Sequence, residues 1–201
     1  MDRDVMHLWT VGYAGHTVES FIELLRAHGI TALVDVRSAP YSKYYAIFNA
    51  PQLGPALRAA GVAYIPMGPE LGARREDPAS FVDGRVDYAR AAREPLFLQG
   101  LARLRRGLSR YTVALMCAEK DPTRCHRTML ITRALSDWRG LVLRHVVGDE
   151  VKTHREVEDM AMARAGVAPD LFRARAQTVE LAYDILNRGL SARKDPSDEH
   201  Q

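Results

Sequence analysis

Residues 112–135 read TVALMC-AEKDPTRCHR-TMLITRAL, and this stretch decides the fold. The first segment is apolar and typical of a buried strand, the second is polar and typical of a loop, and the third predicts a helix. A strand that passes through a short loop into a helix is the basic unit of an open α/β sheet. In such sheets the carboxyl ends of the strands open onto the crevice that binds ligands. The loop is therefore the first place to look for a functional site.

The same alternation extends in both directions from this stretch. Apolar runs predict five strands, and because they are nearly continuous they favour a mostly parallel sheet covered on both faces. Thr17 suits the N-cap of the first helix and Asp170 that of the last. We expect strands at 6–11, 31–36, 62–66, 112–117 and 141–147, and helices at 18–28, 51–60, 95–110, 128–138, 150–165 and 170–188.

The domain organisation follows from this pattern. We expect a single three-layer α/β domain with a mostly parallel sheet of about five strands over residues 1–165, and a C-terminal helical extension with a polar tail over 166–201. Residues 38–50 and 68–77 are expected to be loops. Residues 78–94 carry the weakest pattern, and a short helix within a lid is one interpretation of them.

Composition narrows the function classes. The chain has 201 residues, of which 47% are hydrophobic and 26% charged, as in globular proteins that remain in solution. A formal net charge of +3 permits an anionic ligand without requiring nucleic acid, which remains an open alternative. Two cysteines are too few for a disulfide scaffold. The start of the chain lacks the apolar core of a signal peptide, and no run of 18 apolar residues predicts a membrane span, so we expect a cytoplasmic protein with reduced thiols.

Several short motifs stand in a fixed order along the chain and resemble the pattern of domain-of-unknown-function family 488, from about Leu8 to His154. The resemblance implies a compact α/β domain and leaves the activity open. Family members often carry His after the first glycine of the pattern, where this chain has Tyr13. The motifs are Thr10-Val11-Gly12-Tyr13 with Thr17, Asp35-Val36-Arg37-Ser38, Phe48-Asn49, Gly61-Val62-Ala63-Tyr64, Leu71-Gly72 with Arg74, and Leu115-Met116-Cys117-Ala118-Glu119 followed by Cys125-His126-Arg127.

The loop after the fourth strand supplies most of the candidate chemistry. Cys117 is a candidate nucleophile, because a helix start and nearby cations favour the thiolate. The alternatives are an inert buried thiol and a disulfide with Cys125. A metal site is not expected, because adjacent Cys125 and His126 should point in different directions and no standard ligand spacing is present. Arg127 is expected either to bind an anion or to brace the loop by pairing with Asp35 or Glu119.

Other candidates lie at the ends of neighbouring strands and in the loops. Asp35 and Glu119 are candidate acid/base residues, and if they converge with Glu70, their mutual repulsion would raise one pKa. The predicted catalytic residues are Asp35, Cys117 and Glu119. The predicted ligand-binding residues are Gly12, Tyr13, Arg37, Glu70, Arg74, Arg124, Cys125, His126 and Arg127.

Taken together, these residues predict an enzyme, a hydrolase or group transferase, that acts on a phosphorylated or nucleotide-like small molecule. The chain has no glycine fingerprint for dinucleotides and no P-loop, and no cofactor is expected. Two alternatives stay open. One is a binding module that senses a nucleotide or nucleic acid without turnover. The other is an accessory protein that docks a partner through the C-terminal helix, which is also where we expect a homodimer contact.

Overall fold

The computed structural model describes residues 5–170 and 172–190. Its centre is a six-stranded sheet in the order β3-β2-β6-β1-β7-β8. The first five strands in this order are parallel, and β8 is antiparallel to β7. The strands are β1 (Met6–Gly12), β2 (Ala32–Asp35), β3 (Ala63–Pro66), β6 (Val113–Cys117), β7 (Leu141–Val147) and β8 (Glu150–Thr153).

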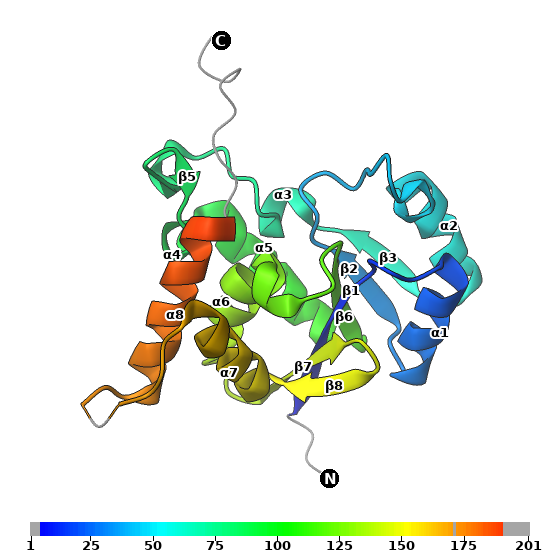
Figure 1. Cartoon of the computed structure of the whole chain (residues 1–201). Helices are drawn as coiled ribbons and strands as arrows, with labels where there is room; N and C mark the ends of the chain where they lie inside the picture. The colour runs from blue at the N-terminus through cyan, green and yellow to red at the C-terminus, as the bar shows by residue number, and fades with distance from the viewer. Residues whose placement is uncertain (1–4, 171, 191–201) are drawn as a thin grey trace.

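Helices cover both faces of the sheet, so the predicted three-layer α/β architecture is confirmed (Figure 1). One face packs against α1 (Val18–Ala27) and α2 (Ala50–Ala59), through a core that includes Phe21, Leu53 and Met116. The other face packs against α5 (Pro95–Leu108), α7 (His154–Ala165) and the π-helical segment Arg127–Thr132, and α8 (Arg175–Leu190) packs on α7. The core on this side includes Phe97, Leu115 and Tyr183. Figure 1 shows the two groups of helices on opposite sides of the strands.

Shorter elements complete the described chain. They are the 3-10 helices at Ala46–Phe48, Pro78–Ser80 and Pro122–Arg124, the helices α3 (Gly68–Leu71), α4 (Tyr88–Ala91) and α6 (Arg133–Leu135), the π-helical segment Arg127–Thr132, and the two-stranded hairpin β4 (Phe81–Val82) and β5 (Arg85–Val86). The segment 78–94 thus holds a hairpin and two short helices. No helix in the described part of the chain is both long and apolar enough to cross a membrane.

The helix starts show which local predictions held. Thr17 caps α1 as predicted, and its hydroxyl accepts the backbone N–H of Ser20 in a capping box. Asp170 does not cap the last helix, because it forms an isolated bridge with Arg173 and α8 begins only at Arg175. The helix predicted from residue 150 was also wrong at its start. Residues 150–153 form β8, and Thr153 caps α7 in a second capping box with Glu156.

The C-terminal helix packs on its own chain. Thr178, Val179, Ala182 and Tyr183 of α8 are buried, and α7 is its main neighbour. An Arg133 guanidinium from α6 also forms ion pairs with Glu180 and Asp184 on the outer part of α8. The homodimer contact predicted for this helix stays a prediction. The polar tail predicted at 191–201 lies outside the described residues.

Candidate functional site

A cavity of about 330 Å³ opens at the carboxyl ends of β1 and β6, and we call it the Cys117 pocket. It lies where parallel strands end, which is the usual place for a ligand site in an open α/β sheet. Its walls come from the loop after β6, from the loops after β1 and α3, and from α4 and α8. The lining residues are Ala14, Ala73, Tyr88, Cys117, Ala118, Glu119, Arg124, Cys125, His126 and Leu190.

The backbone after β1 holds the pocket loop in place. Beyond the last strand pair, Tyr13 N donates to Cys117 O at 3.1 Å and Ala14 N donates to Ala118 O at 3.1 Å. Gly12 makes this close approach possible, because a Cβ at that position would collide with the carbonyl group of Glu119. Gly12 therefore contributes by having no side chain where two backbones meet.

Arg127 lies beneath the loop and is fully buried. Its guanidinium donates to the backbone carbonyl of Glu119 and, at 3.1 Å, to that of Lys120. The sequence suggested that a bracing Arg127 would pair with a carboxylate of Asp35 or Glu119. The structure instead joins it to backbone oxygens of the loop, and Arg127 is not among the residues that line the pocket.

A second brace reaches the loop from α7. The Asp121 carboxylate accepts hydrogen bonds from Thr123 N at 2.8 Å and Thr123 Oγ1 at 2.7 Å, which closes a tight turn. Arg164 donates from its Nε to Thr123 Oγ1 at 2.8 Å and forms an ion pair with Asp121. Sequence reasoning did not find Arg164, because a single arginine on a charged helix carries no signal of a contact 41 residues away.

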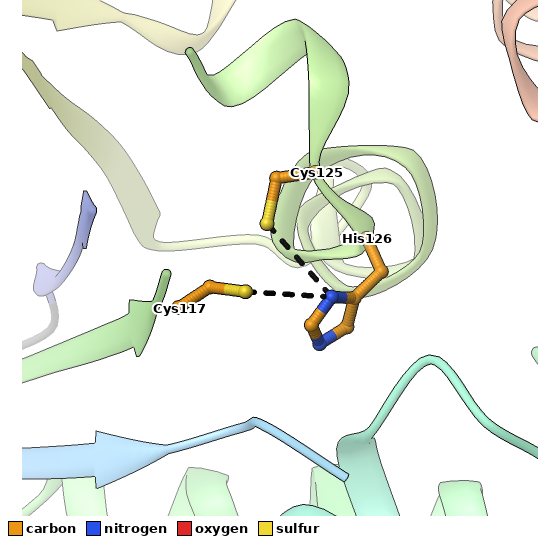
Figure 2. A group of neighbouring side chains, drawn as sticks. All are labelled: Cys117, Cys125 and His126. Atoms are coloured by element: carbon orange, nitrogen blue, oxygen red, sulfur yellow. Dashed lines mark hydrogen bonds between the residues drawn. The ribbon is translucent and has the colours of Figure 1, made fainter. Parts of the chain in front are cut away.

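Cys117, Cys125 and His126 converge on the floor of the pocket (Figure 2). The Nδ1 atom of His126 lies 3.7 Å from the Sγ of Cys117 and 3.8 Å from the Sγ of Cys125. Cys117 is at the end of β6, whereas Cys125 and His126 directly precede the π-helical segment. The expectation that adjacent Cys125 and His126 would point apart was therefore wrong. We call these three residues the Cys–His cluster.

The two thiols of the cluster have different environments. A hydrogen bond from Cys125, together with the neighbouring His126 and the charge of Arg127, holds the pKa of the Cys117 thiol well below its ordinary value, despite burial. Burial and the neighbouring Cys117 raise the pKa of the Cys125 thiol. Both cysteines are free. The environment thus favours a thiolate at Cys117 with Cys125 as its hydrogen-bond donor.

Asp35 and Arg37 form a separate buried cluster at the end of β2. The Arg37 guanidinium makes a forked ion pair with the Asp35 carboxylate, at 2.9 Å from Nε and 2.6 Å from Nη2. The Tyr64 hydroxyl donates to the same carboxylate at 2.6 Å, and Arg37 donates to the Tyr13 hydroxyl at 3.3 Å. Burial and the hydrogen bond to Asp35 raise the pKa of the Tyr64 hydroxyl. Asp35 and Arg37 thus form a closed, buried ion pair.

Glu70 and Arg74, which were also predicted to bind a ligand, lie outside the Cys117 pocket. Glu70 pairs with Arg103 at 2.7 Å, between α3 and α5. Arg74 lines a second cavity of about 510 Å³, together with Ser38, Arg75 and Glu94. Glu119 lines the Cys117 pocket and Asp35 and Glu70 do not, so the three carboxylates do not share this pocket.

Five of the predicted site residues meet at one pocket. They are Cys117, Glu119, Arg124, Cys125 and His126. Arg124 is exposed and has no hydrogen-bond or ion-pair partner among the described residues. Five lining residues were not among the predicted site residues: Ala14, Ala73, Tyr88, Ala118 and Leu190. Tyr88 comes from the weakly patterned segment 78–94, and Leu190 is the last residue of α8, far along the chain.

Comparison with known proteins identifies a family and no characterised relative. Residues 17–134, more than half of the chain, match the family described as "Domain of unknown function DUF488". The matched region includes the whole loop from Cys117 to Arg127, and it ends before α7 and α8. No curated protein and no solved structure matches the chain.

Proposed function

This chain belongs to the DUF488 family, and from its own site we propose that it is an enzyme, a hydrolase or group transferase, that acts on a phosphorylated or nucleotide-like small molecule. One observation carries the proposal. The Cys117 thiol, the Nδ1 atom of His126 at 3.7 Å from it, and Arg124, which has no partner among the described residues, line the same pocket at the end of the central strands. This combination of nucleophile, base and cation is typical of sites that transfer charged groups.

The cation argues for an anionic substrate. Arg124 lines the mouth of the pocket, and a guanidinium binds phosphate oxygens through a fork of N–H donors. Arg124 is exposed and makes no hydrogen bond or ion pair within the described part of the chain, so binding an anion there would break no interaction. The pocket volume of about 330 Å³ suits a small molecule.

The Cys–His cluster and Glu119 supply the groups that the reaction needs. Hydrolysis and group transfer require an activated nucleophile and a group that protonates the leaving oxygen. The Cys–His cluster supplies the first function. Glu119 lies in the same pocket, is half-buried and supplies the second.

Turnover of defined compounds tests the proposal. The tag-free protein is incubated with p-nitrophenyl phosphate, nucleoside mono-, di- and triphosphates and sugar phosphates, and product release is measured. We expect turnover of at least one compound, a loss of kcat of roughly 100-fold or more in Cys117→Ser, and a raised KM in Arg124→Gln. Arg110→Gln is the matched control, because Arg110 is an exposed arginine near the opposite end of β6.

Two results would count against the proposal. If no compound is turned over but one binds, the chain is a nucleotide-binding module without catalysis. If Cys117→Ser retains the rate of the wild type, the Cys–His cluster is not the reactive centre.

A further inference from the structure

The three ligand-type atoms of the Cys–His cluster are arranged as in a metal site. The Sγ atoms of Cys117 and Cys125 and the Nδ1 atom of His126 all lie within 4.8 Å of one another. Thiolate and imidazole are the ligands that zinc prefers in proteins. Zn–S bonds of about 2.3 Å and Zn–N bonds of about 2.0–2.1 Å, at tetrahedral angles, separate sulfur from nitrogen by about 3.6 Å. The observed separations of 3.7 and 3.8 Å are close to this value.

The histidine ring is held in the orientation that a metal ligand needs. Its Nε2 lies 2.9 Å from the carbonyl oxygen of Val36, the residue that follows β2. A carbonyl oxygen only accepts hydrogen bonds, so Nε2 carries the proton. In the neutral ring Nδ1 then presents its lone pair, and Figure 2 shows this atom facing both sulfur atoms. A hydrogen bond from the distal nitrogen to a backbone carbonyl is how metal-binding histidines are commonly fixed.

Cys125 distinguishes a metal site from a simple thiol nucleophile. A nucleophilic Cys117 needs only His126, yet Cys125 is 3% exposed and its sulfur is as near to Nδ1 as that of Cys117. A dication bound by two thiolates and a neutral imidazole is electrically neutral, which suits a buried position. All three residues line the Cys117 pocket, so a cation held by them would be reached from the pocket.

We propose that Cys117, Cys125 and His126 bind a divalent cation of the zinc class, with its remaining coordination position open to the Cys117 pocket. Three protein ligands with one open position are the arrangement of catalytic rather than structural zinc sites. The use of the open position rests on the proposed function: with the cation bound, Cys117 and His126 would serve as its ligands, and a water on the cation would take the place of the thiolate as nucleophile beside the substrate anion. The binding of the cation does not rest on it.

Metal titration tests the proposal without any substrate. The full chain, free of affinity tag, reduced and stripped with a chelator, is titrated with Zn²⁺ against a chromophoric competitor and separately with Co²⁺. We expect one equivalent of Zn²⁺, and with Co²⁺ the thiolate-to-cobalt charge-transfer and tetrahedral ligand-field absorption. Cys117→Ser, Cys125→Ser and His126→Gln should each weaken Zn²⁺ binding by roughly 100-fold or more. His7→Gln, at the exposed start of β1, should bind like the wild type.

Each outcome decides the proposal. No stoichiometric Zn²⁺ binding by the wild type, or binding that survives all three ligand substitutions, would overturn it. If a variant does not fold, the wild type alone suffices: Zn²⁺ should protect both cysteines from iodoacetamide, as mapped by mass spectrometry, and equal labelling with and without Zn²⁺ would overturn the proposal. Zn²⁺ binding without turnover of any phosphate compound would contradict the proposed function and leave the metal site intact. Turnover by metal-free protein would show that the reaction does not use the cation, whereas the titration alone decides whether the cation binds.

Discussion

Arg127 donates a hydrogen bond to the backbone carbonyl of Glu119, so a fully buried guanidinium fixes the loop that carries the pocket. Replacing Arg127 with Ala would leave the carbonyl oxygens of Glu119 and Lys120 without their donor and open a cavity. Each buried polar group left unsatisfied costs about 1–3 kcal/mol. We expect Arg127→Ala to lower the free energy of unfolding by about 3–5 kcal/mol.

Chemical denaturation measures this loss. Arg110→Ala is the control, because the exposed Arg110 should contribute no more than about 0.5 kcal/mol. A stable Arg127→Ala protein that has lost only anion binding would show instead that Arg127 is a ligand-binding residue.

Gly12 gives a second test of the same loop. A methyl group at this position would collide with the Glu119 carbonyl, so Gly12→Ala should destabilise the protein by about 1–3 kcal/mol and disturb the pocket. In Gly107→Ala, the new methyl group would meet no heavy atom within 4 Å, and Gly107 lies inside α5. That control should stabilise the protein by about 0.5–1 kcal/mol. Thermal unfolding of both variants would show opposite signs; a neutral Gly12→Ala would contradict the close approach.

A buried histidine pair predicts how stability depends on pH. His145 Nε2 and His154 Nδ1 lie 3.1 Å apart, and Thr10 Oγ1 lies 3.0 Å from His145 Nδ1. Burial lowers the pKa of His154 to about 4, and burial together with His154 also lowers the pKa of His145 well below its ordinary value. Glu158 is 3.6 Å from His154 Nε2, which is too far for a hydrogen bond that would offset this effect.

The sign of the effect follows from linkage. Between about pH 6.5 and about pH 4 the unfolded chain binds a proton at His154 that the folded chain does not bind. The contribution of His154 to the free energy of unfolding is therefore full above about pH 6.5 and is lost as the pH falls toward about 4. From about pH 7 to about pH 5, His154 alone should account for a loss of about 2 kcal/mol. In His154→Gln the slope of unfolding free energy against pH should be smaller, whereas His7→Gln should keep the slope of the wild type. Equal slopes in all three proteins would refute a neutral His154.

The sequence predicted the parallel strands well because apolar residues dominate each of them, and β2 and β6 are buried along their whole length. It missed β8 because Glu150–Thr153 is a polar, mostly exposed edge strand, whose residues resemble the first turn of a charged helix. It extended the last helix to Asp170 because an acidic residue after Pro169 resembles an N-cap, although that residue pairs with Arg173 instead.

The candidate site could be predicted in part. The local sequence pattern predicts where the strand ends and where the next helix begins. It therefore placed Cys117, Glu119 and Arg124 together in the loop between them. The convergence of Cys125 with His126 depends on how the chain enters the π-helical segment, which no spacing rule describes. Asp35 and Arg37 are two positions apart, so their pairing could be read from local sequence. Their burial and the hydrogen bond from Tyr64 depend on the tertiary fold and could not be predicted.

The most direct test of the central claim, that the Cys117 pocket binds an anionic small molecule, is a thermal-shift screen of nucleotides, sugar phosphates and inorganic phosphate. The screen compares the wild type with Arg124→Gln and Arg110→Gln. A ligand that binds only the folded state raises the melting temperature. We predict a compound that stabilises the wild type and Arg110→Gln equally and has no effect on Arg124→Gln. If no compound stabilises the wild type, or if the shift persists unchanged in Arg124→Gln, the claim is contradicted.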